Sequence, residues 1–397
     1  MDQSSIRRLL DEPQAVELFR AIPALAGRRF SGEFVRYWVK PGRYFNGSFR
    51  LHFDDGGSVI ASAFAVGASQ AAKILRKHVD RDSSAVAEPG LLLQLFPHDY
   101  RLPTLASCLD PTRINEAVGG KLPDVEIEPV GYWPGMRCQL RYSTPTRVMY
   151  GKVALEREPG RAFEIQARVN KALEWPWRIF RTPGVVCYLA DLGLTFTSAV
   201  PGRSLHDLLP GNGDLTRAIV LTASALAQLH AVSLDCIERV YRPEDELQLL
   251  HGWIELAGEL FPHLHAELRA REDDLQRTAP EGSSSLAVVH RDFYDKQLLL
   301  FEGGLSLLDL DTVCHGDAEI DIGNFAAHLW LRGLQLQESK RCDDLAATFV
   351  AAYPATVDPR RVRWYRRTAL LRLACNYAMR PRWRQIAPAI IEECRRS

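Results

Sequence analysis

A cluster of charged and polar residues lies between two apolar segments in the C-terminal half of the chain. The segment from Val288 to Leu300 reads VVHRDFYDKQLLL, and its centre contains His290, Asp292 and Gln297. Apolar flanks of this kind are typical of buried strand or turn, where polar groups are rare unless they are paired. Two interpretations are open at this point: a salt-bridged corner of the fold, or a catalytic loop.

A further carboxylate follows the cluster at a spacing that predicts a hairpin. The segment LSLLDLD places Asp309 at the end of an apolar strand, and the Gly303-Gly304 turn separates that strand from the one before it. A hairpin brings its two ends together, so we expect Asp292, Gln297 and Asp309 to converge. Two carboxylates and an amide oxygen are hard ligands suited to Mg²⁺, which often binds together with a phosphate-bearing substrate.

The same residue types are the components of kinase-type phosphoryl transfer. In that reaction one Asp orients the attacking hydroxyl and takes its proton, while an amide side chain and a second Asp hold the metal ion. Taken alone, an Asp at the end of a strand is a turn residue. The hairpin spacing between Asp292 and Asp309 therefore favours the catalytic interpretation.

The sequence resembles the aminoglycoside-phosphotransferase-like kinases, which are small-molecule relatives of the protein kinases. The resemblance runs from about Val125 to the C-terminus, and Gln297 resembles the maltokinase-like branch, which has Gln in place of the usual Asn and an N-terminal cap domain. Three family motifs are matched: H-G-D-x-x-x-x-N by His290, Arg291, Asp292 and Gln297, I-D-W/F by Leu308, Asp309 and Leu310, and G-D-P-x-x-D-L by Gly316, Asp317, Asp321 and Ile322.

This resemblance implies an α+β, bilobal protein-kinase-like fold with a β-rich N-lobe, a mostly helical C-lobe and an additional N-terminal α/β cap. We expect the cap over residues 1–88, the N-lobe over 89–200, and the C-lobe with the catalytic loop over 201–397. The polar segment DRDSSAVAEPG is the candidate boundary between cap and N-lobe. Helical periodicity in residues 1 to about 30 and strand-like alternation after it agree with this division.

The resemblance also assigns roles to the residues of the cluster. Asp292 is expected to be the base that orients the substrate hydroxyl, and Gln297 and Asp309 are expected to be the Mg²⁺ ligands, with Asp311 as a further candidate. His290 is expected to be a structural hydrogen-bonding group behind the loop. The two carboxylates of the third motif are expected to brace the loop by facing Arg side chains or backbone N–H groups.

A kinase also needs a cation on the phosphates of its nucleotide. The strand in RVMYGKVALE supplies Lys152, and the helix after it carries Glu164 as the expected ion-pair partner, with Glu174 and Glu156 as weaker candidates. A strand Lys is by itself more often a solvent-facing residue. Its place in the third strand of a sheet, before a helix, favours nucleotide binding.

The remaining nucleotide contacts are expected from the backbone. TFTSAVPGRSLHDLL resembles the hinge between kinase lobes, and backbone groups near Ser198 and Val200 are predicted to bind adenine. There is no G-x-G-x-x-G motif for the phosphates. YWPGMRC takes the place of that turn, with Gly135 as its glycine.

Composition and charge exclude several other classes of protein. The chain has 397 residues, of which 46% are hydrophobic and 25% charged, and its formal net charge is zero. A neutral chain of ordinary composition has no overall attraction to nucleic acid or to anionic membrane. The N-terminus lacks an apolar signal region and no run approaches the roughly 20 apolar residues of a membrane span, so we expect a cytoplasmic protein. The eight cysteines show no C-x-x-C motif and are expected to be reduced thiols.

The acceptor of the phosphoryl group is left open by the sequence. The C-terminal segment PRRVRWYRRTALLRLACNYAMRPRWRQ interleaves basic and aromatic residues, which suits a neutral sugar or an anionic group, whereas residues 244–281 are acidic. We expect an ATP- and Mg²⁺-dependent phosphotransferase that acts on a hydroxyl of a small molecule, either sugar-like or of the aminoglycoside and antibiotic type.

A protein of another class is the alternative. A kinase-fold binding or scaffold protein would act on a peptide or partner protein with weak or no phosphoryl transfer, and the unusual Gln297 favours it. The joint presence of Lys152, Asp292 and Asp309 argues against it, because a scaffold needs none of them. The short segment between Asp309 and Asp321 leaves no room for the activation segment of a protein kinase.

Overall fold

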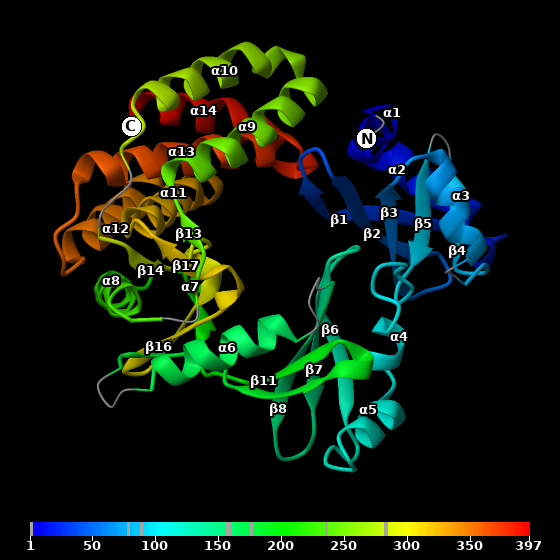
Figure 1. The fold of residues 1–397 in the computed structure, drawn as a ribbon. Coiled ribbons are helices and arrows are strands. Elements are labelled where there is room, and N and C mark those ends of the chain that lie inside the picture. The colour runs from blue at the N-terminus through cyan, green and yellow to red at the C-terminus, as the bar shows by residue number, and fades with distance from the viewer. Residues whose placement is uncertain are drawn as a thin grey trace.

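The computed structural model describes residues 3–77, 80–87, 90–155, 160–174, 178–234, 237–281 and 285–397. These residues form three parts in chain order: an N-terminal unit built on a five-stranded sheet, a second five-stranded sheet with its own helices, and a larger, mainly helical part (Figure 1). The order of sheets and helices is the one expected from the sequence.

The N-terminal unit packs two short helices on the first sheet. Asp11 caps the second of them, since its carboxylate accepts a hydrogen bond from the backbone N–H of Gln14 at 3.1 Å. Phe19, just after that helix, places its ring 5.5 Å from the ring of Phe49 in the sheet. The elements are α1 (Gln3–Leu10), α2 (Glu12–Leu18), β1 (Phe30–Lys40), β2 (Tyr44–Phe53), β3 (Ser58–Ala65), α3 (Ala68–Lys77), β4 (Ser84–Ala87) and β5 (Leu91–Leu95), with strand order β1-β2-β3-β5-β4.

The polar segment predicted as a connector contains a strand. β4 lies within DRDSSAVAEPG and pairs antiparallel with β5 in the first sheet. Ser84 is buried there, and its hydroxyl accepts a hydrogen bond from the Gln94 amide at 3.2 Å. The boundary predicted between residues 88 and 89 falls between these two paired strands, so we propose that the N-terminal unit extends to Leu95.

The second sheet is antiparallel throughout and carries the strands predicted for the N-lobe. Its order is β10-β11-β8-β7-β6, which places the strand of Lys152 at the centre. The elements are α4 (Leu105–Cys108), α5 (Pro111–Ala117), β6 (Glu126–Trp133), β7 (Arg137–Ser143), β8 (Val148–Ala154), α6 (Arg161–Ala172), β10 (Val185–Leu189) and β11 (Leu194–Ser198).

The third part is mainly helical and contains two small sheets. Its helices are α7 (Leu205–Leu208), α8 (Thr216–His230), α9 (Pro243–Leu260), α10 (Pro262–Arg277), α11 (Glu319–Leu336), α12 (Ser339–Ala352), α13 (Pro359–Ala378) and α14 (Ala387–Arg396). Its strands are β9 (Phe180–Arg181), β12 (Arg203–Ser204), β13 (Val240–Tyr241), β14 (Ala287–Val289), β15 (Leu298–Phe301), β16 (Gly304–Leu307) and β17 (Cys314–Gly316). Within the described residues, no helix is long and apolar enough to cross a lipid bilayer.

Gly323 allows α11 and α13 to pack closely against each other. A Cβ atom on Gly323 in α11 would lie 2.6 Å from the backbone nitrogen of Arg366 in α13, so only glycine permits this close approach. The first turn of α11 is thereby held against α13, beneath the loop that contains Asp292.

The N-terminal unit contacts both other parts of the molecule (Figure 1). The Asn46 side chain in β2 donates a hydrogen bond to the carbonyl of Pro134, in the turn between β6 and β7, at 2.9 Å. At its other side, the Arg7 guanidinium in α1 donates to the carbonyl of Leu260, at the end of α9, at 3.0 Å. The unit therefore bridges the second sheet and the helical part.

Candidate active site

The loop that contains Asp292 is held by a buried carboxylate beneath it. Asp321, in the first turn of α11, accepts hydrogen bonds from the backbone N–H groups of His290 at 2.6 Å and Arg291 at 2.7 Å. Arg291 has a left-handed backbone, with φ of 67°, which a bulky residue adopts only when its surroundings enforce it. His230 contacts the same carboxylate at 3.0 Å. Asp321 thus braces the loop, as expected.

His290 is a structural residue, as its sequence position suggested. Its Nε2 atom lies 2.8 Å from the carbonyl oxygen of Leu308, which can only accept a hydrogen bond, so Nε2 carries the proton. Its Nδ1 atom is then free to accept the backbone N–H of Asp292 at 3.3 Å. Because both ring nitrogens are used to orient the loop, His290 has no part as a proton carrier.

Asp292 combines a fixed position with a raised proton affinity. The Gln297 side-chain amide donates a hydrogen bond to its carboxylate at 3.4 Å. Burial raises the pKa of the Asp292 carboxyl above its ordinary value, and the negative charge of Asp309 adds to this. A carboxylate of this kind is a stronger base than an exposed one.

The predicted hairpin is present and brings the candidate residues together. β15 pairs antiparallel with β16, with Leu298 opposite Leu307, and the backbone N–H of Leu308 donates to the carbonyl of Gln297 at 2.9 Å. Gln297 and Asp309 therefore lie at the same end of the hairpin. Asp309 has a left-handed backbone with φ of 57°, which turns the chain directly after the strand.

Two cations from the second sheet face the carboxylates of this site. The Arg137 guanidinium in β7 lies 3.2 Å from the carboxylate of Asp309 and 3.5 Å from that of Asp311, and the Lys152 ammonium in β8 also contacts Asp311. Burial alone would raise the pKa of the Asp309 carboxyl, but the charges of Arg137 and Lys152 outweigh burial and lower this pKa. Sequence reasoning missed Arg137, whose only signal was its place two residues after Gly135.

The expected ion pair between Lys152 and Glu164 is not formed. Glu164 lies in α6 but is exposed, and no hydrogen bond or ion pair of its side chain occurs among the described residues. Glu174 is likewise without an ion pair there, and Glu156 lies outside the described residues. Asp311, considered only as a further metal candidate, is a carboxylate that contacts Lys152.

In the predicted hinge, some backbone groups are used in hydrogen bonds within the protein and others are available to a ligand. The Ser198 backbone N–H donates to Gly184 at 2.8 Å, and the Ser198 hydroxyl accepts from the backbone N–H of Gly184 at 2.9 Å. Within the described part of the chain, no backbone hydrogen bond involves Val200. If the hinge binds a base, the groups after Ser198 are the ones that can do so.

The carboxylate and amide of this site suit a hard metal ion. Asp309 and Gln297 offer oxygen ligands of the kind that Mg²⁺ binds, with its other positions taken by water or phosphate. Across the described ranges, no group of three or more His, Cys, Asp or Glu side chains is placed to hold a metal ion.

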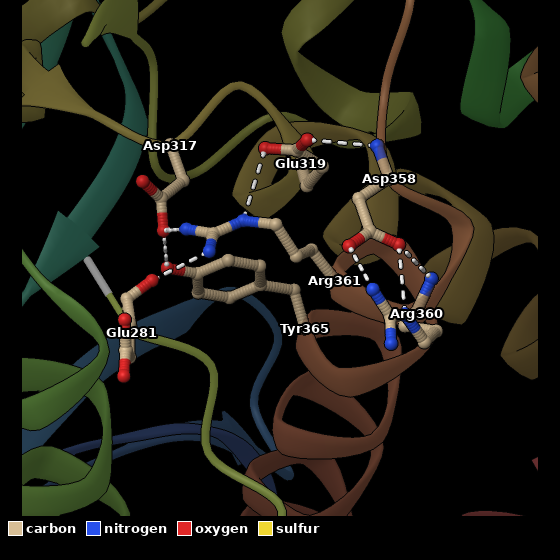
Figure 2. Close-up of polar contacts among 7 residues, drawn as sticks. All are labelled: Glu281, Asp317, Glu319, Asp358, Arg360, Arg361 and Tyr365. Atoms are coloured by element: carbon tan, nitrogen blue, oxygen red, sulfur yellow. Dashed lines mark hydrogen bonds and ion pairs between the residues drawn. The ribbon is translucent and has the colours of Figure 1, made fainter. Parts of the chain in front are cut away.

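A second carboxylate anchors the chain just before α11. Figure 2 shows Asp317 between Arg361 and Tyr365 of α13, and the Tyr365 hydroxyl donates to Asp317 at 2.6 Å. Arg361 also donates to the carbonyl of Glu281 at 2.6 Å and lies 3.8 Å from Glu319. Asp317 is therefore a brace rather than a reacting group.

A further buried carboxylate in the loop was not singled out from the sequence. Asp295 is fully buried, and its carboxylate contacts the Arg332 guanidinium at 2.8 Å and His206 at 2.6 Å. Next to it, the rings of Tyr294 and His328 lie 4.6 Å apart. A second Asp three residues after the first was the available signal, but only the fold supplies its partners.

Cys314, beside the third motif, is an unreactive thiol. All seven cysteines in the described part of the chain are free thiols. Cys314 is fully buried, and burial raises its pKa to about 11, so the thiol stays protonated. Cys314, next to His315 in the chain, is therefore not an activated nucleophile.

The fold defines the class of the protein. Choline kinase from Cryptosporidium parvum Iowa II is similar to this chain, with 12% sequence identity and a TM-score of 0.54 over 72% of this chain and 95% of that one. A thermostable mutant of aminoglycoside phosphotransferase APH(4)-Ia in its apo form has 15% identity and a TM-score of 0.53 over 71% of this chain and 97% of that one. A further variant of that mutant, in a ternary complex with AMP-PNP and hygromycin B, has 14% identity and a TM-score of 0.51 over 72% of this chain and 97% of that one. The predicted α+β, bilobal protein-kinase-like fold is confirmed.

A match to a protein-family model identifies the family of this chain. Residues 154–365 match the model of the phosphotransferase enzyme family, APH, and this segment is more than half of the chain. The chain therefore belongs to the phosphotransferase enzyme family, and the prediction of an enzyme of the small-molecule kinase class is confirmed. A comparison with curated protein sequences gave no match.

Proposed function

We propose that this enzyme transfers the γ-phosphate of ATP, in the presence of Mg²⁺, to a hydroxyl group of a small molecule. The observation that carries the proposal is the pairing of two unlike carboxylates across one hairpin: Asp292 has a raised pKa, and Asp309 has a lowered one beside two cations. Related phosphotransferase structures with bound AMP-PNP or ADP support the choice of nucleotide.

Each residue then has one task in the reaction. Asp292 orients the acceptor hydroxyl and accepts its proton as the oxygen attacks the γ-phosphorus atom. Gln297 and Asp309 would hold Mg²⁺, which when bound neutralises charge on the phosphate oxygens. Lys152 and Arg137 would bind the phosphates.

The nucleotide base and the partner of Lys152 complete the proposed site. Backbone groups of the hinge near Ser198 and Val200 would bind adenine. Glu164 remains the proposed partner of Lys152 in the nucleotide-bound enzyme, where phosphate and metal would compete for the contacts that Asp311 makes in the structure.

We further propose that the N-terminal unit is a cap domain of the kind found in the maltokinase-like branch. The similar structures are covered almost completely by 71–72% of this chain, so the chain contains residues beyond the shared kinase fold. Gln297 at the position of the usual Asn supports the same branch. A sugar-like acceptor is favoured by this assignment, and a cytoplasmic location remains a prediction.

An ATP-consumption screen tests the proposal. The purified enzyme would be assayed with sugars, sugar acids, sugar phosphates, aminoglycosides and nucleosides, with Mg²⁺ omitted as one control and Asp292→Asn as another. We expect acceptor-dependent ADP release that requires both Mg²⁺ and Asp292. Acceptor-dependent release that persists in the Asp292→Asn variant would reject the assigned base. No transfer to any acceptor, with ATP bound, would favour the scaffold alternative.

A further inference from the structure

A β-bulge directs one arginine of the N-terminal unit away from its own core. The register between β1 and β2 shifts between Phe34, opposite Phe49, and Arg36, opposite Ser48. Because of this shift Tyr37, rather than Arg36, packs beside Phe34, with 4.3 Å between the two ring centroids. A bulge exchanges the faces of the residues that follow it, so Arg36 points out of the aromatic core.

Because of the β-bulge, the Arg36 side chain lies at the edge of the proposed phosphoryl-transfer site. Its guanidinium lies 4.4 Å from the centroid of the Trp133 ring, and the Arg137 guanidinium lies 4.5 Å from the same ring. Arg137 in turn is 3.2 Å from Asp309. One aromatic side chain therefore links the cation of the N-terminal unit to the carboxylate proposed to hold Mg²⁺.

Arg36 is partly shielded from solvent, yet none of the described residues is an anionic partner for it. Within the described residues its side chain makes no hydrogen bond and no ion pair, in contrast to Arg137. Burial lowers the pKa of Arg36, and the positive charges of Arg137 and Arg380 lower it further. A cation kept near other cations without a carboxylate is characteristic of a site whose anion arrives with a ligand.

Two more cations are exposed side chains, one within the loop that contains Asp292 and one just after α13. Lys296 lies in the 3-10 turn η4 (Asp295–Gln297), and Arg380, just after α13, lies 4.4 Å from the Tyr377 ring. Neither forms an ion pair with a described residue. The Asp295 carboxylate, adjacent to Lys296 in the chain, is already engaged by Arg332.

Tyr294 is a further polar residue of the loop that contains the base. It lies two residues after Asp292, and its hydroxyl makes no hydrogen bond within the described part of the chain. Burial raises the pKa of Tyr294, and the charge of Asp292 raises it further, so the hydroxyl stays protonated. A hydroxyl without a hydrogen bond, two residues from the proposed base, is available to an acceptor molecule.

We propose that Arg36, Lys296 and Arg380 bind an anionic group of the acceptor, so that the substrate is a hydroxyl compound that also carries a carboxylate or a phosphate. This inference rests on the phosphoryl transfer proposed above. It disfavours aminoglycosides, whose amino groups are positively charged, and it assigns acceptor recognition in part to the N-terminal unit. The same cations could instead meet the γ-phosphate of ATP, and the experiment separates these two sources.

Anion binding is measured first, without any need for turnover. Thermal unfolding is followed with increasing sulfate in the presence of saturating ADP and Mg²⁺, which occupy the nucleotide site. We expect sulfate to stabilise the wild type and Arg43→Gln, and to stabilise Arg36→Gln and Arg380→Gln much less. Arg43 is the matched control, because it is an exposed arginine of the same hairpin. An equal sulfate effect in all four proteins overturns the proposal, as does sulfate competing with ADP.

Acceptor kinetics then identify the source of the anion. We expect glucuronate or glucose 6-phosphate to exceed glucose in kcat/KM by about tenfold or more, the effect of a charge-assisted hydrogen bond. Arg36→Gln should raise the acceptor KM by a similar factor and leave the ATP KM unchanged. Preference for a neutral or cationic acceptor, or a rise in the ATP KM alone, contradicts the proposal.

Two controls keep the outcomes distinct. If Arg36→Gln is less stable than the wild type, Arg36→Lys retains the charge and should recover anion binding. Its failure to do so in a folded protein would show that packing on Trp133, rather than charge, is the role of Arg36. Sulfate binding that depends on Arg36, with no phosphoryl transfer to any acceptor, would reject the proposed function while leaving the anion site in place.

Discussion

Asp292 and Asp309 are both partly buried, yet their pKa values move in opposite directions. Asp309 has the Arg137 guanidinium at 3.2 Å, whereas the Asp292 carboxylate accepts a hydrogen bond from the neutral amide of Gln297 at 3.4 Å. Cations hold Asp309 in the ionised form that a metal ligand needs, while burial gives Asp292 the proton affinity that a base needs. The difference between the two environments separates the two proposed tasks.

The metal assignment predicts unequal effects of two substitutions. Asp309→Ala removes a charged ligand and should abolish Mg²⁺-dependent nucleotide binding. Gln297→Asn keeps the amide oxygen and loses one methylene group, so we expect only a several-fold weakening. A Mg²⁺ titration of ADP binding by calorimetry measures both. Wild-type curves for both variants would remove the metal from this hairpin.

A buried histidine predicts a pH dependence of stability. Burial lowers the pKa of His328 to about 3, so the folded state keeps the ring neutral while the unfolded chain binds a proton near pH 6.5. Stability from this group is present above pH 6.5 and is lost as the pH falls toward 3. Between pH 7 and pH 5 the loss is about 2 kcal/mol. His328→Leu should lose that much less in urea unfolding, and equal losses would contradict the assigned shift.

At the scale of elements, the loop and hairpin were the parts that the sequence predicted best. Both are local: the polar segment from Val288 to Leu300, the glycine turn and Asp309 are joined by a single hairpin. The partners that come from distant elements could not be predicted this way. Arg137 reaches Asp309 from another sheet, and Lys152 meets Asp311 rather than Glu164, because the approach of the two lobes, not sequence spacing, decides these contacts.

Because Asp321 of α11 holds the catalytic loop, its substitution should lower the free energy of unfolding substantially. Asp321→Ala leaves the N–H groups of His290 and Arg291 buried without acceptors, which costs about 3–5 kcal/mol and releases the strained loop. Denaturant unfolding measures the loss, and Asp273→Ala, at an exposed carboxylate of α10, is the matched control. A change below about 1 kcal/mol in Asp321→Ala would show that the loop holds its own shape.

At the scale of the whole molecule, the N-terminal unit is integrated with the kinase fold. Its aromatic residues belong to the same buried cluster as the helices of the C-lobe, and Asn46 and Arg7 contact the two other parts. The sequence predicted this unit as a separate cap, with a boundary inside what is a paired sheet. The predicted boundary falls between β4 and β5 because β4 is only four residues long and follows the polar residues of the segment, so that its pairing with β5 is what marks it as a strand.

A carboxylate between the N-terminal unit and the N-lobe predicts a link from the unit to nucleotide binding. Asp99 accepts hydrogen bonds from Gly135 at 2.6 Å and Tyr132 at 2.8 Å, and so fixes the turn between β6 and β7. Asp99→Ala should cost about 1–3 kcal/mol and raise the ATP KM several-fold. Asp191→Ala, at an exposed carboxylate of the same lobe, is the control. An unchanged ATP KM in a destabilised Asp99→Ala protein would separate the turn from the nucleotide.

The central claim is that Asp292 is the base of an ATP-dependent phosphoryl transfer. The most direct test is kcat for Asp292→Asn with an acceptor that the wild type phosphorylates, together with the Kd of ADP and Mg²⁺ for both proteins. We expect kcat to fall about 10²–10⁴-fold, because the amide cannot take the proton, while the Kd is unchanged. A variant that binds the nucleotide as the wild type does and turns over at the wild-type rate would contradict the claim.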